Sequence, residues 1–194
     1  MRRGVFLDRD GTLSEEVGYL DHIDRFRLYP WVPALIRRLN DADLPVILIT
    51  NQSGVARGYF PESLIAQVHE KMQGELASAG ARIDAFYYCP HHPDKGNAPY
   101  KQKCECRKPE IGMLRQASHD LGIDLASSYV VGDKYLDVET AFRAHARGIL
   151  VLSGYGKEEY DRSKHQWPRP PDFVAPDLAA AVDYILMDIS NSRA

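Results

Sequence analysis

The sequence predicts an α/β fold, a Rossmann-like sandwich of three layers with a mainly parallel central sheet. Short apolar runs alternate along the chain with segments whose apolar residues recur every three or four positions, the pattern of strands connected by helices. The chain has 194 residues, of which 44% are hydrophobic and 26% are charged, as in an ordinary globular protein with one core. We therefore expect a single domain over residues 1–194.

Five apolar runs are the predicted strands, and five amphipathic segments are the predicted helices. In chain order the strands are residues 5–8, 46–50, 85–89, 129–132 and 149–152. The helices are residues 31–41, 62–79, 110–121, 137–147 and 177–187, the last after a proline-rich loop at 167–171. Gly80, Gly122 and Gly148 follow three of these helices, where a left-handed C-terminal cap requires glycine.

Composition and charge exclude several classes of function. The formal net charge of −3 argues against a nucleic-acid-binding surface, although it is compatible with a local basic pocket. No apolar run approaches the roughly 18 residues of a membrane span, and the first residues lack the apolar core of a secretory signal. We expect a cytoplasmic, monomeric protein that binds neither nucleic acid nor membrane.

Polar residues follow three of the predicted strands. Asp8 and Asp10 stand at the end of the first strand, Thr50 at the end of the second, and Asp133 directly after the fourth. Ligands of such sheets bind beyond the carboxyl ends of the strands, so these side chains should share one site. A solvated acidic turn is the alternative for Asp8 and Asp10 alone. The whole set suits phosphoryl transfer, which needs a nucleophile, a hard cation, positive charge near the phosphoryl oxygens and an acid.

All three cysteines lie in one short window of the chain. Cys89-x-His91 is followed, after twelve residues, by Cys104-x-Cys106. Three thiolates and one imidazole are the ligand set of a closed tetrahedral Zn²⁺ site, and four protein ligands leave no open position for catalysis. A disulfide is disfavoured by the odd count and by the cytosolic setting. We therefore expect a structural zinc.

The predicted zinc would pin the polar loop of residues 89–106. This loop ends at Arg107 and Lys108, so zinc binding should orient these two cations. His92 is the alternative to His91 as the fourth ligand, and we expect it to face solvent or substrate instead.

Four segments, in order, resemble the motifs of the haloacid dehalogenase superfamily: Asp8-x-Asp10-Gly11-Thr12, Thr50-Asn51-Gln52-Ser53-Gly54, Arg107-Lys108-Pro109 and Gly132-Asp133-x₃-Asp137. The resemblance implies that Asp8 attacks phosphorus and becomes an aspartyl-phosphate. It implies that Asp10 protonates the leaving oxygen and later deprotonates the attacking water. Thr50 would donate a hydrogen bond to the phosphate, and Lys108 would neutralise its charge and restrain Asp8.

The resemblance also implies a catalytic Mg²⁺. Its protein ligands would be the carboxylates of Asp8 and Asp133 and the backbone carbonyl of Asp10, with a phosphate oxygen and waters completing an octahedron. Asp137 is expected to support the water shell of the metal rather than to bind the metal directly. Lys134 would contact either Asp10 or the substrate, with a solvated surface lysine as the alternative.

Over nearly its whole length the chain is similar to the family of D-glycero-D-manno-heptose 1,7-bisphosphate phosphatases, through residues 6–12, 18–19, 50–58, 87–93 and 104–109. This implies hydrolysis of the 7-phosphate, with the 1-phosphate spared, in nucleotide-heptose and lipopolysaccharide biosynthesis. No segment is long enough for a cap domain, so the site should be open. The implied substrate contacts are Glu16, Gly18, Tyr19, Asn51, Gln52, Ser53, Arg107 and Lys134, with Arg107 on the phosphate that is kept.

Two other functions stay open from the sequence. A histidinol-phosphate phosphatase shares the capless core, the zinc loop and the Arg-Lys-Pro motif, although the longer 53–60 loop and the Gly18-Tyr19 pair favour the heptose family. A non-catalytic zinc-binding interaction module is the alternative from another class, and the intact acidic motifs argue against it. The sequence does not distinguish the α from the β anomer of the 1-phosphate.

Overall fold

A six-stranded parallel sheet forms the centre of the structure, a computed structural model that describes residues 2–191. The strand order is β3-β2-β1-β4-β5-β6, and every neighbouring pair is parallel. The strands are β1 (Val5–Leu7), β2 (Val46–Asn51), β3 (Ala85–Cys89), β4 (Tyr129–Gly132), β5 (Arg147–Val151) and β6 (Phe173–Ala175). The predicted α/β sandwich with a parallel sheet is confirmed.

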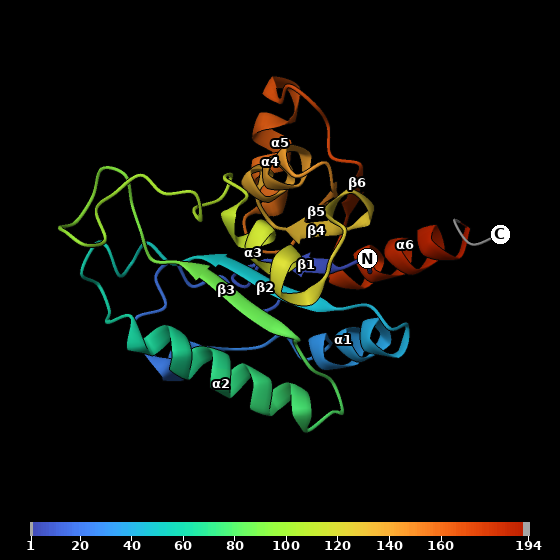
Figure 1. Ribbon diagram of the computed structural model, residues 1–194, viewed down its shortest axis with the longest axis horizontal. Coiled ribbons are helices and arrows are strands. Elements are labelled where there is room, and N and C mark those ends of the chain that lie inside the picture. The colour runs from blue at the N-terminus through green and yellow to red at the C-terminus, as the bar shows by residue number, and fades with distance from the viewer. Residues whose placement is uncertain (1, 192–194) are drawn as a thin grey trace.

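Helices cover both faces of this sheet, as Figure 1 shows. On one face lie α1 (Val32–Asp41) and α2 (Ser63–Ala77), with α6 (Leu178–Asn191) packed beside α1. On the other lie α3 (Gly112–Leu121), α4 (Tyr135–Arg143) and α5 (Gly156–Ser163). Three short 3₁₀ turns complete the described elements, at Ile23–Arg25, Leu125–Ser127 and Lys164–Gln166.

The alternation of side chains along β1 divides the core into two layers. Val5 and Leu7 pack in the cluster that includes α1, α2 and α6, whereas Phe6 packs in the cluster that includes α3 and α4. All three residues are fully buried. A strand buried on both faces in this way reads as a continuous apolar run, which is why the sequence predicted it readily.

The predicted elements are all present, with bounds that differ by a few residues. Helix α4 is shifted most, because it begins at Tyr135 rather than at residue 137 and ends at Arg143 rather than at 147. Besides the three short 3₁₀ turns, one helix and one strand were missed. Helix α5 has Gly156 as its one buried residue, and β6 is only three residues long, so neither gives an apolar periodicity that can be read.

One of the three predicted glycine caps is wrong. Gly122 is left-handed at the end of α3 (φ 65°), and Gly80 is left-handed three residues beyond α2 (φ 70°). Gly148 lies inside β5, and His145 takes the left-handed conformation after α4 instead (φ 58°). Gly148 is needed for another reason: a Cβ there would lie 2.9 Å from Val138 Cγ1 of α4.

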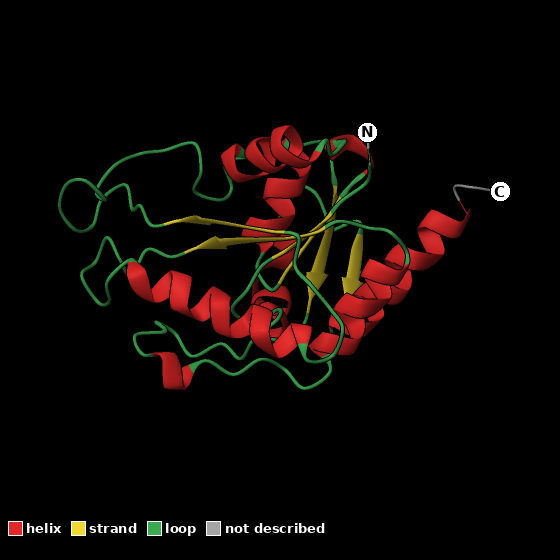
Figure 2. Cartoon of the chain, turned by 60° about the horizontal axis from the view of Figure 1, so that its bottom comes forward, coloured by secondary structure: helices red, strands yellow, loops and turns green. Residues whose placement is uncertain are grey.

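The strand order places β1 and β4 side by side at the middle of the sheet, where the order along the chain reverses. In parallel α/β sheets this switch point opens a crevice beyond the carboxyl ends of the strands. Asp8 and Asp133 directly follow these two strands. Figure 2 shows that the long loops gather at one end of the sheet, beyond β2 and β3.

No cap domain is inserted in the part of the chain that the structure describes. The connection from β1 to β2 contains only loops, a 3₁₀ turn and α1, and that from β2 to β3 contains α2. The expected capless architecture is therefore confirmed over residues 2–191. None of the helices described in this range is long and apolar enough to cross a bilayer.

Candidate active site

The chain turns sharply after β1, and this turn presents Asp8 and Asp10 at the carboxyl edge of the sheet. The backbone N–H groups of Leu13 and Ser14 donate to the carbonyl oxygen of Arg9 at 2.8 and 3.0 Å, which closes the turn. Gly11 has a positive φ of 82°, a conformation that a residue with a Cβ rarely adopts.

Lys108 lies between Asp8 of the first motif and Asp137 of the fourth. Its ammonium donates hydrogen bonds to Asp8 Oδ1 at 2.8 Å and Asp137 Oδ1 at 2.6 Å, and the side chain is fully buried. Burial alone would lower the pKa of Lys108, but the carboxylates of Asp137 and Asp8 outweigh it and raise the pKa. Lys108 is thus a fixed positive charge beside Asp8.

Three buried carboxylates, of Asp8, Asp133 and Asp137, lie so close that one oxygen of each is within 4.8 Å of the others. Burial, followed by the charge of Asp8, raises the pKa of Asp133 to about 8. Burial likewise raises the pKa of Asp8 to about 6, although Lys108 opposes the shift. Crowded, desolvated carboxylates of this kind favour a hard divalent cation.

The donor set fits such a cation. Asp133 Oδ1 is buried and has no hydrogen-bond partner, so it is available as a ligand. Asp137, by contrast, accepts from Lys108 through Oδ1 and from the backbone N–H of Lys134 through Oδ2 at 3.2 Å. Each Asp137 oxygen thus has one partner within the protein, and one lone-pair site on each stays open.

The loop after β5 holds Asp133 in place, and the sequence did not predict its involvement. The backbone N–H of Tyr155 donates to Asp133 Oδ2 at 2.8 Å, and the Ser153 hydroxyl donates to the Gly11 carbonyl at 2.6 Å. A Cβ on Gly11 or Gly154 would collide with Asp133 Oδ2. The available signal was Ser-Gly-Tyr-Gly directly after a predicted strand, at the same sheet edge as the other motifs.

Asp10 is surrounded by donors. Its carboxylate accepts two hydrogen bonds from the Arg9 guanidinium and one from Gln52 Nε2 at 3.0 Å. Gln52 Nε2 also donates to Thr50 Oγ1 at 2.9 Å, which leaves the Thr50 hydroxyl proton free to donate elsewhere. Gln52, predicted as a substrate contact, thus directs its amide to two of the predicted catalytic residues.

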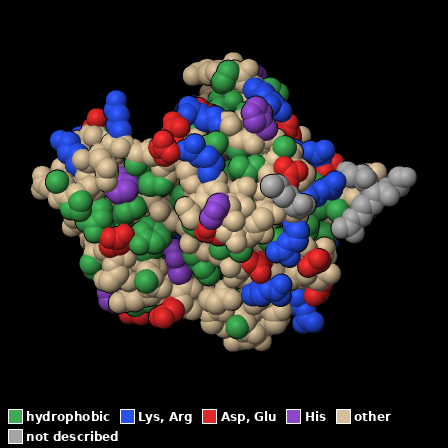
Figure 3. Space-filling view, in the orientation of Figure 1, with side chains coloured by type: hydrophobic (Ala, Val, Ile, Leu, Met, Phe, Trp, Pro, Cys, Tyr) green, Lys and Arg blue, Asp and Glu red, His purple; other side chains and the backbone are tan. Residues whose placement is uncertain are grey.

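An open pocket of about 340 Å³ brings nearly all predicted site residues together. It is hollowed between the long loops and the helices that follow β4 and β5, where Figure 3 shows an indentation of the surface. Its walls contain every predicted substrate contact and all predicted catalytic side chains. The wall also contains Asp137 and Gly54 of the motifs, and the residues in it that were not predicted are Leu20, Phe60, Leu136 and Tyr155.

Several of the predicted substrate contacts already have partners within the protein. Lys134 Nζ lies 3.6 Å from Glu16 Oε2 and 4.7 Å from the centre of the Tyr155 ring, rather than on Asp10. Glu16 Oε1 also accepts from the backbone N–H of Gly18. The Asn51 side chain exchanges two hydrogen bonds with the Lys108 backbone, and so joins the second motif to the third.

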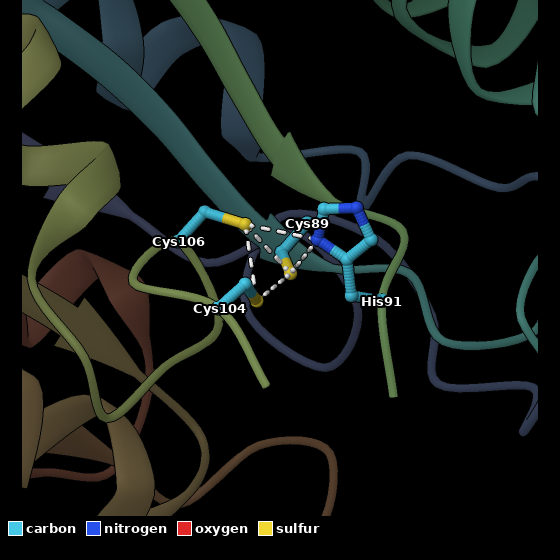
Figure 4. A group of neighbouring side chains, drawn as sticks. All are labelled: Cys89, His91, Cys104 and Cys106. Atoms are coloured by element: carbon cyan, nitrogen blue, oxygen red, sulfur yellow. Dashed lines mark hydrogen bonds between the residues drawn. The ribbon is translucent and has the colours of Figure 1, made fainter. Parts of the chain in front are cut away.

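Cys89, His91, Cys104 and Cys106 converge at the end of β3, as Figure 4 shows. Cys106 Sγ lies 3.0 and 3.4 Å from the other two sulfurs and 3.4 Å from His91 Nδ1. Tetrahedral zinc with bonds of about 2.3 Å separates its sulfurs by roughly 3.8 Å, so a small expansion would accommodate it. All three thiols are free, and the hydrogen bond between Cys106 and Cys89 is the main cause that lowers the pKa of Cys106 to about 5.

His92 points away from this cluster. Its Nδ1 accepts from the backbone N–H groups of Asp94 and Lys95, and its Nε2 lies 3.0 Å from Arg57. The geometry therefore favours His91 over His92 as the fourth ligand. The carbonyl oxygen of His91 also accepts from Arg107 at 3.2 Å, which ties the cysteine cluster to the pocket.

Comparisons with known proteins assign the chain to a family. A family model described as "HAD-hyrolase-like" matches residues 105–181. D-glycero-D-manno-heptose-1,7-bisphosphate 7-phosphatase of Thermosynechococcus vestitus is 44% identical over 188 residues, which are 95% of each chain. The chain belongs to this heptose bisphosphate phosphatase family. D-glycero-beta-D-manno-heptose-1,7-bisphosphate 7-phosphatase of Yersinia pestis is 45% identical over 79% of this chain and 81% of its own.

A solved structure of the heptose bisphosphate phosphatase family matches the fold. The D,D-heptose 1,7-bisphosphate phosphatase of B. bronchiseptica, complexed with magnesium and phosphate, is 35% identical and superposes with a TM-score of 0.83. The match covers 96% of this chain and 99% of the other. A relative that binds magnesium and phosphate agrees with the acidic, capless pocket described above.

Proposed function

We propose that this protein hydrolyses the 7-phosphate of D-glycero-D-manno-heptose 1,7-bisphosphate and releases the heptose 1-phosphate. The observation that carries the proposal is the Lys108 ammonium, fixed between Asp8 and Asp137 on the wall of a pocket that reaches to Arg107 and Lys134. One cation thus lies at the carboxylate that would attack phosphorus, and two more are available to a second phosphate. The family membership supports the same substrate class.

In the proposed reaction Asp8 attacks phosphorus and forms an aspartyl-phosphate. Lys108 holds the attacking carboxylate and neutralises charge on the phosphoryl oxygens, and the Thr50 hydroxyl donates to one of them. Asp10 gives a proton to the leaving sugar oxygen and then takes one from the water that hydrolyses the intermediate. The pocket wall next to Asp8 already contains both Asp10 and Thr50.

Mg²⁺ is the proposed cofactor, held by the carboxylates of Asp8 and Asp133 and the backbone carbonyl of Asp10. It supplies charge stabilisation at the phosphoryl group when bound. The unpartnered Asp133 Oδ1 and the raised pKa of both carboxylates support this ligand set.

A structural Zn²⁺ is proposed for Cys89, His91, Cys104 and Cys106. Its contribution to function would be indirect, through the hydrogen bond from Arg107 to the His91 carbonyl. A guanidinium held in this way can bind the 1-phosphate with a fork of two hydrogen bonds. We propose that Arg107, together with Lys134, binds the phosphate that is kept.

The test is phosphate release in the presence of Mg²⁺ from both anomers of the heptose 1,7-bisphosphate and from histidinol phosphate. We expect a bisphosphate anomer to have the highest kcat/KM, because histidinol phosphate has no second phosphate for Arg107 and Lys134. The Asp8→Asn protein is the matched control and should release essentially none. Higher kcat/KM for histidinol phosphate would overturn the proposed substrate, and turnover by Asp8→Asn would overturn the proposed nucleophile.

A further inference from the structure

Among the described residues, Arg9 is the largest fully buried side chain, and the proposed reaction gives it no role. It is 1% exposed, and its guanidinium donates to Asp10 through Nε at 3.0 Å and through NH2 at 2.8 Å. Burying a guanidinium is costly unless it is paired. Asp10 is the one acidic partner that the described ion pairs give Arg9, and Arg9 NH1 is buried without a hydrogen-bond partner.

A second donor reaches Asp10 from a different part of the chain. Gln52 lies just beyond β2, is 5% exposed, and donates from Nε2 to the same Oδ2 that accepts from Arg9 NH2. Two buried side chains, from the first and second motifs, therefore converge on one carboxylate. This convergence also connects Asp10 to Thr50, the other acceptor of the Gln52 amide.

The two oxygens of Asp10 are not equivalent in this arrangement. A carboxylate offers about four lone-pair sites, two on each oxygen. Arg9 NH2 and Gln52 fill both sites of Oδ2, whereas Arg9 Nε fills one site of Oδ1. The site that stays open is on Oδ1, and Asp10 lines the pocket.

We propose that Arg9 and Gln52 are positioning residues for Asp10, which saturate Oδ2 and leave Oδ1 as the oxygen that exchanges the proton. The inference rests on the proposed function, in which Asp10 is the acid and then the base. As the bond between phosphorus and the leaving oxygen breaks, its electron pair stays on that oxygen and the proton moves there from Oδ1. In the second step Oδ1 takes a proton from water while the water oxygen bonds to phosphorus and the Asp8 oxygen departs.

Gln52→Met and Arg9→Lys test the proposal. Gln52→Met removes one donor to Oδ2, and Arg9→Lys replaces the two-pronged guanidinium by a single ammonium; both variants keep a long side chain. The readout is kcat/KM for phenyl phosphate, 4-nitrophenyl phosphate and the best sugar phosphate. This constant reports the steps up to and including the first phosphoryl transfer, in which Asp10 acts as the acid. A mispositioned acid should matter most when the leaving group is a weak acid. We expect at least about a tenfold loss for the sugar and phenyl esters, as a part of the 10²–10⁴-fold that such an acid contributes. The expected loss for 4-nitrophenyl phosphate is less than about threefold.

The matched control is the double variant Asp10→Asn with Gln52→Met. If Gln52 acts through Asp10, adding Gln52→Met to Asp10→Asn should change kcat/KM less than twofold. Equal losses for all leaving groups, or a full loss in the Asp10→Asn background, would overturn the proposal and indicate an effect through Thr50. Should Arg9→Lys fail to fold in a thermal melt, the Gln52 variants still decide. Failure of the proposed reaction can be told apart from failure of this inference. If Asp10 were not the acid, Asp10→Asn alone would leave the turnover of phenyl phosphate unchanged.

Discussion

At the scale of single residues, Lys108 has to balance two buried carboxylates at once. Asp8 and Asp137 each accept one of its hydrogen bonds, and neither the lysine nor its partners is appreciably exposed. Removing one member of a buried ionic cluster leaves the others without compensation, which costs far more than losing a pair on the surface. The same lysine is therefore important for stability as well as for the proposed reaction.

Lys108→Met should accordingly abolish turnover and lower the free energy of unfolding by about 3–5 kcal/mol in metal-free protein at pH 8. Urea unfolding measures the loss. Lys134→Met is the matched control for stability, because Lys134 is partly exposed and lies 3.6 Å from Glu16, so its loss should cost at most about 1 kcal/mol. Equal costs for the two variants would contradict the balance described for Lys108.

The structure also shows which features of the residue scale are not readable from the sequence. Asp8, Asp10 and Asp133 were predictable because each lies within three residues of the end of an apolar run. The partners of Gln52 were not, because its amide direction depends on Asp10, which is 42 positions away along the chain. The Tyr155 N–H bond to Asp133 was missed for the same reason.

At the scale of elements, the loop after β5 and the turn after β1 close around Asp133. Gly154 has a φ of 53°, and a Cβ at this position would meet Asp133 Oδ2 and Gly11 Cα. Gly122, at the end of α3, has a comparable φ of 65° but open space around its missing Cβ. Substitution of either glycine would strain the backbone, but only substitution of Gly154 would also bring a side chain into collision with Asp133.

Gly154→Ala should lose activity by displacing Asp133, whereas Gly122→Ala should only destabilise the fold by roughly 1 kcal/mol. Phosphate release at increasing Mg²⁺ concentration, together with thermal melts, tests this pair. We expect Gly154→Ala to require more Mg²⁺ for half of its maximal rate and Gly122→Ala to match the wild type. The same Mg²⁺ dependence in both variants would show that the close approach to Asp133 is unimportant.

The loop between β3 and α3 contains no helix or strand, so we expect the cysteine cluster to keep it ordered. Cys106→Ser should reduce the bound zinc and lower the melting temperature. It should also weaken substrate binding more than it slows the chemical step, since Arg107 is attached to the loop through the His91 carbonyl. Metal analysis and a comparison of KM with kcat measure these effects.

His92→Ala is the control for the cysteine cluster, because His92 has its own hydrogen bonds outside it. This variant should keep its full zinc content. Loss of zinc in His92→Ala, or full zinc in Cys106→Ser, would contradict the ligand set.

Element boundaries followed from the sequence where the apolar run is continuous, and they shifted where a polar residue interrupts it. The bounds of β3 and β4 agree with the prediction to the residue, whereas β5 begins two residues earlier than predicted, at Arg147. Exposed Arg147 breaks the apolar run without breaking the ladder, because it pairs with Tyr129 of β4 through the backbone. Polar helix α5 was invisible to periodicity, although it follows the loop that holds Asp133.

At the scale of the whole molecule, the acidic site opposes folding when no metal balances it. The pKa of Asp133 is raised by burial from an ordinary 3.8 to about 8, and that of Asp8 to about 6. A carboxyl whose pKa is higher in the folded state binds its proton more tightly there. As pH rises from about 4 towards 8, these groups therefore reduce the free energy of unfolding of the metal-free protein.

Mg²⁺ should reverse this loss, because it binds the ionised carboxylates and only in the folded protein. The difference in Tm between Mg²⁺-loaded and EDTA-treated protein should therefore grow from pH 5 to pH 8. Asp133→Asn is the control and should flatten the dependence. A difference in Tm that is the same at both pH values would argue against a metal held by these carboxylates.

All residues that converge on the pocket lie at one end of a parallel sheet, and this arrangement has a practical consequence. Every strand begins at the opposite end, so the described N-terminal residues enter the sheet there, and α6 also leads away from the loops around the pocket (Figure 1). An affinity tag, a fluorescent reporter or a solid support attached beside Arg2 or beside Asn191 would thus stand away from the mouth of the pocket. Immobilised protein should accordingly process its substrate as freely as protein in solution.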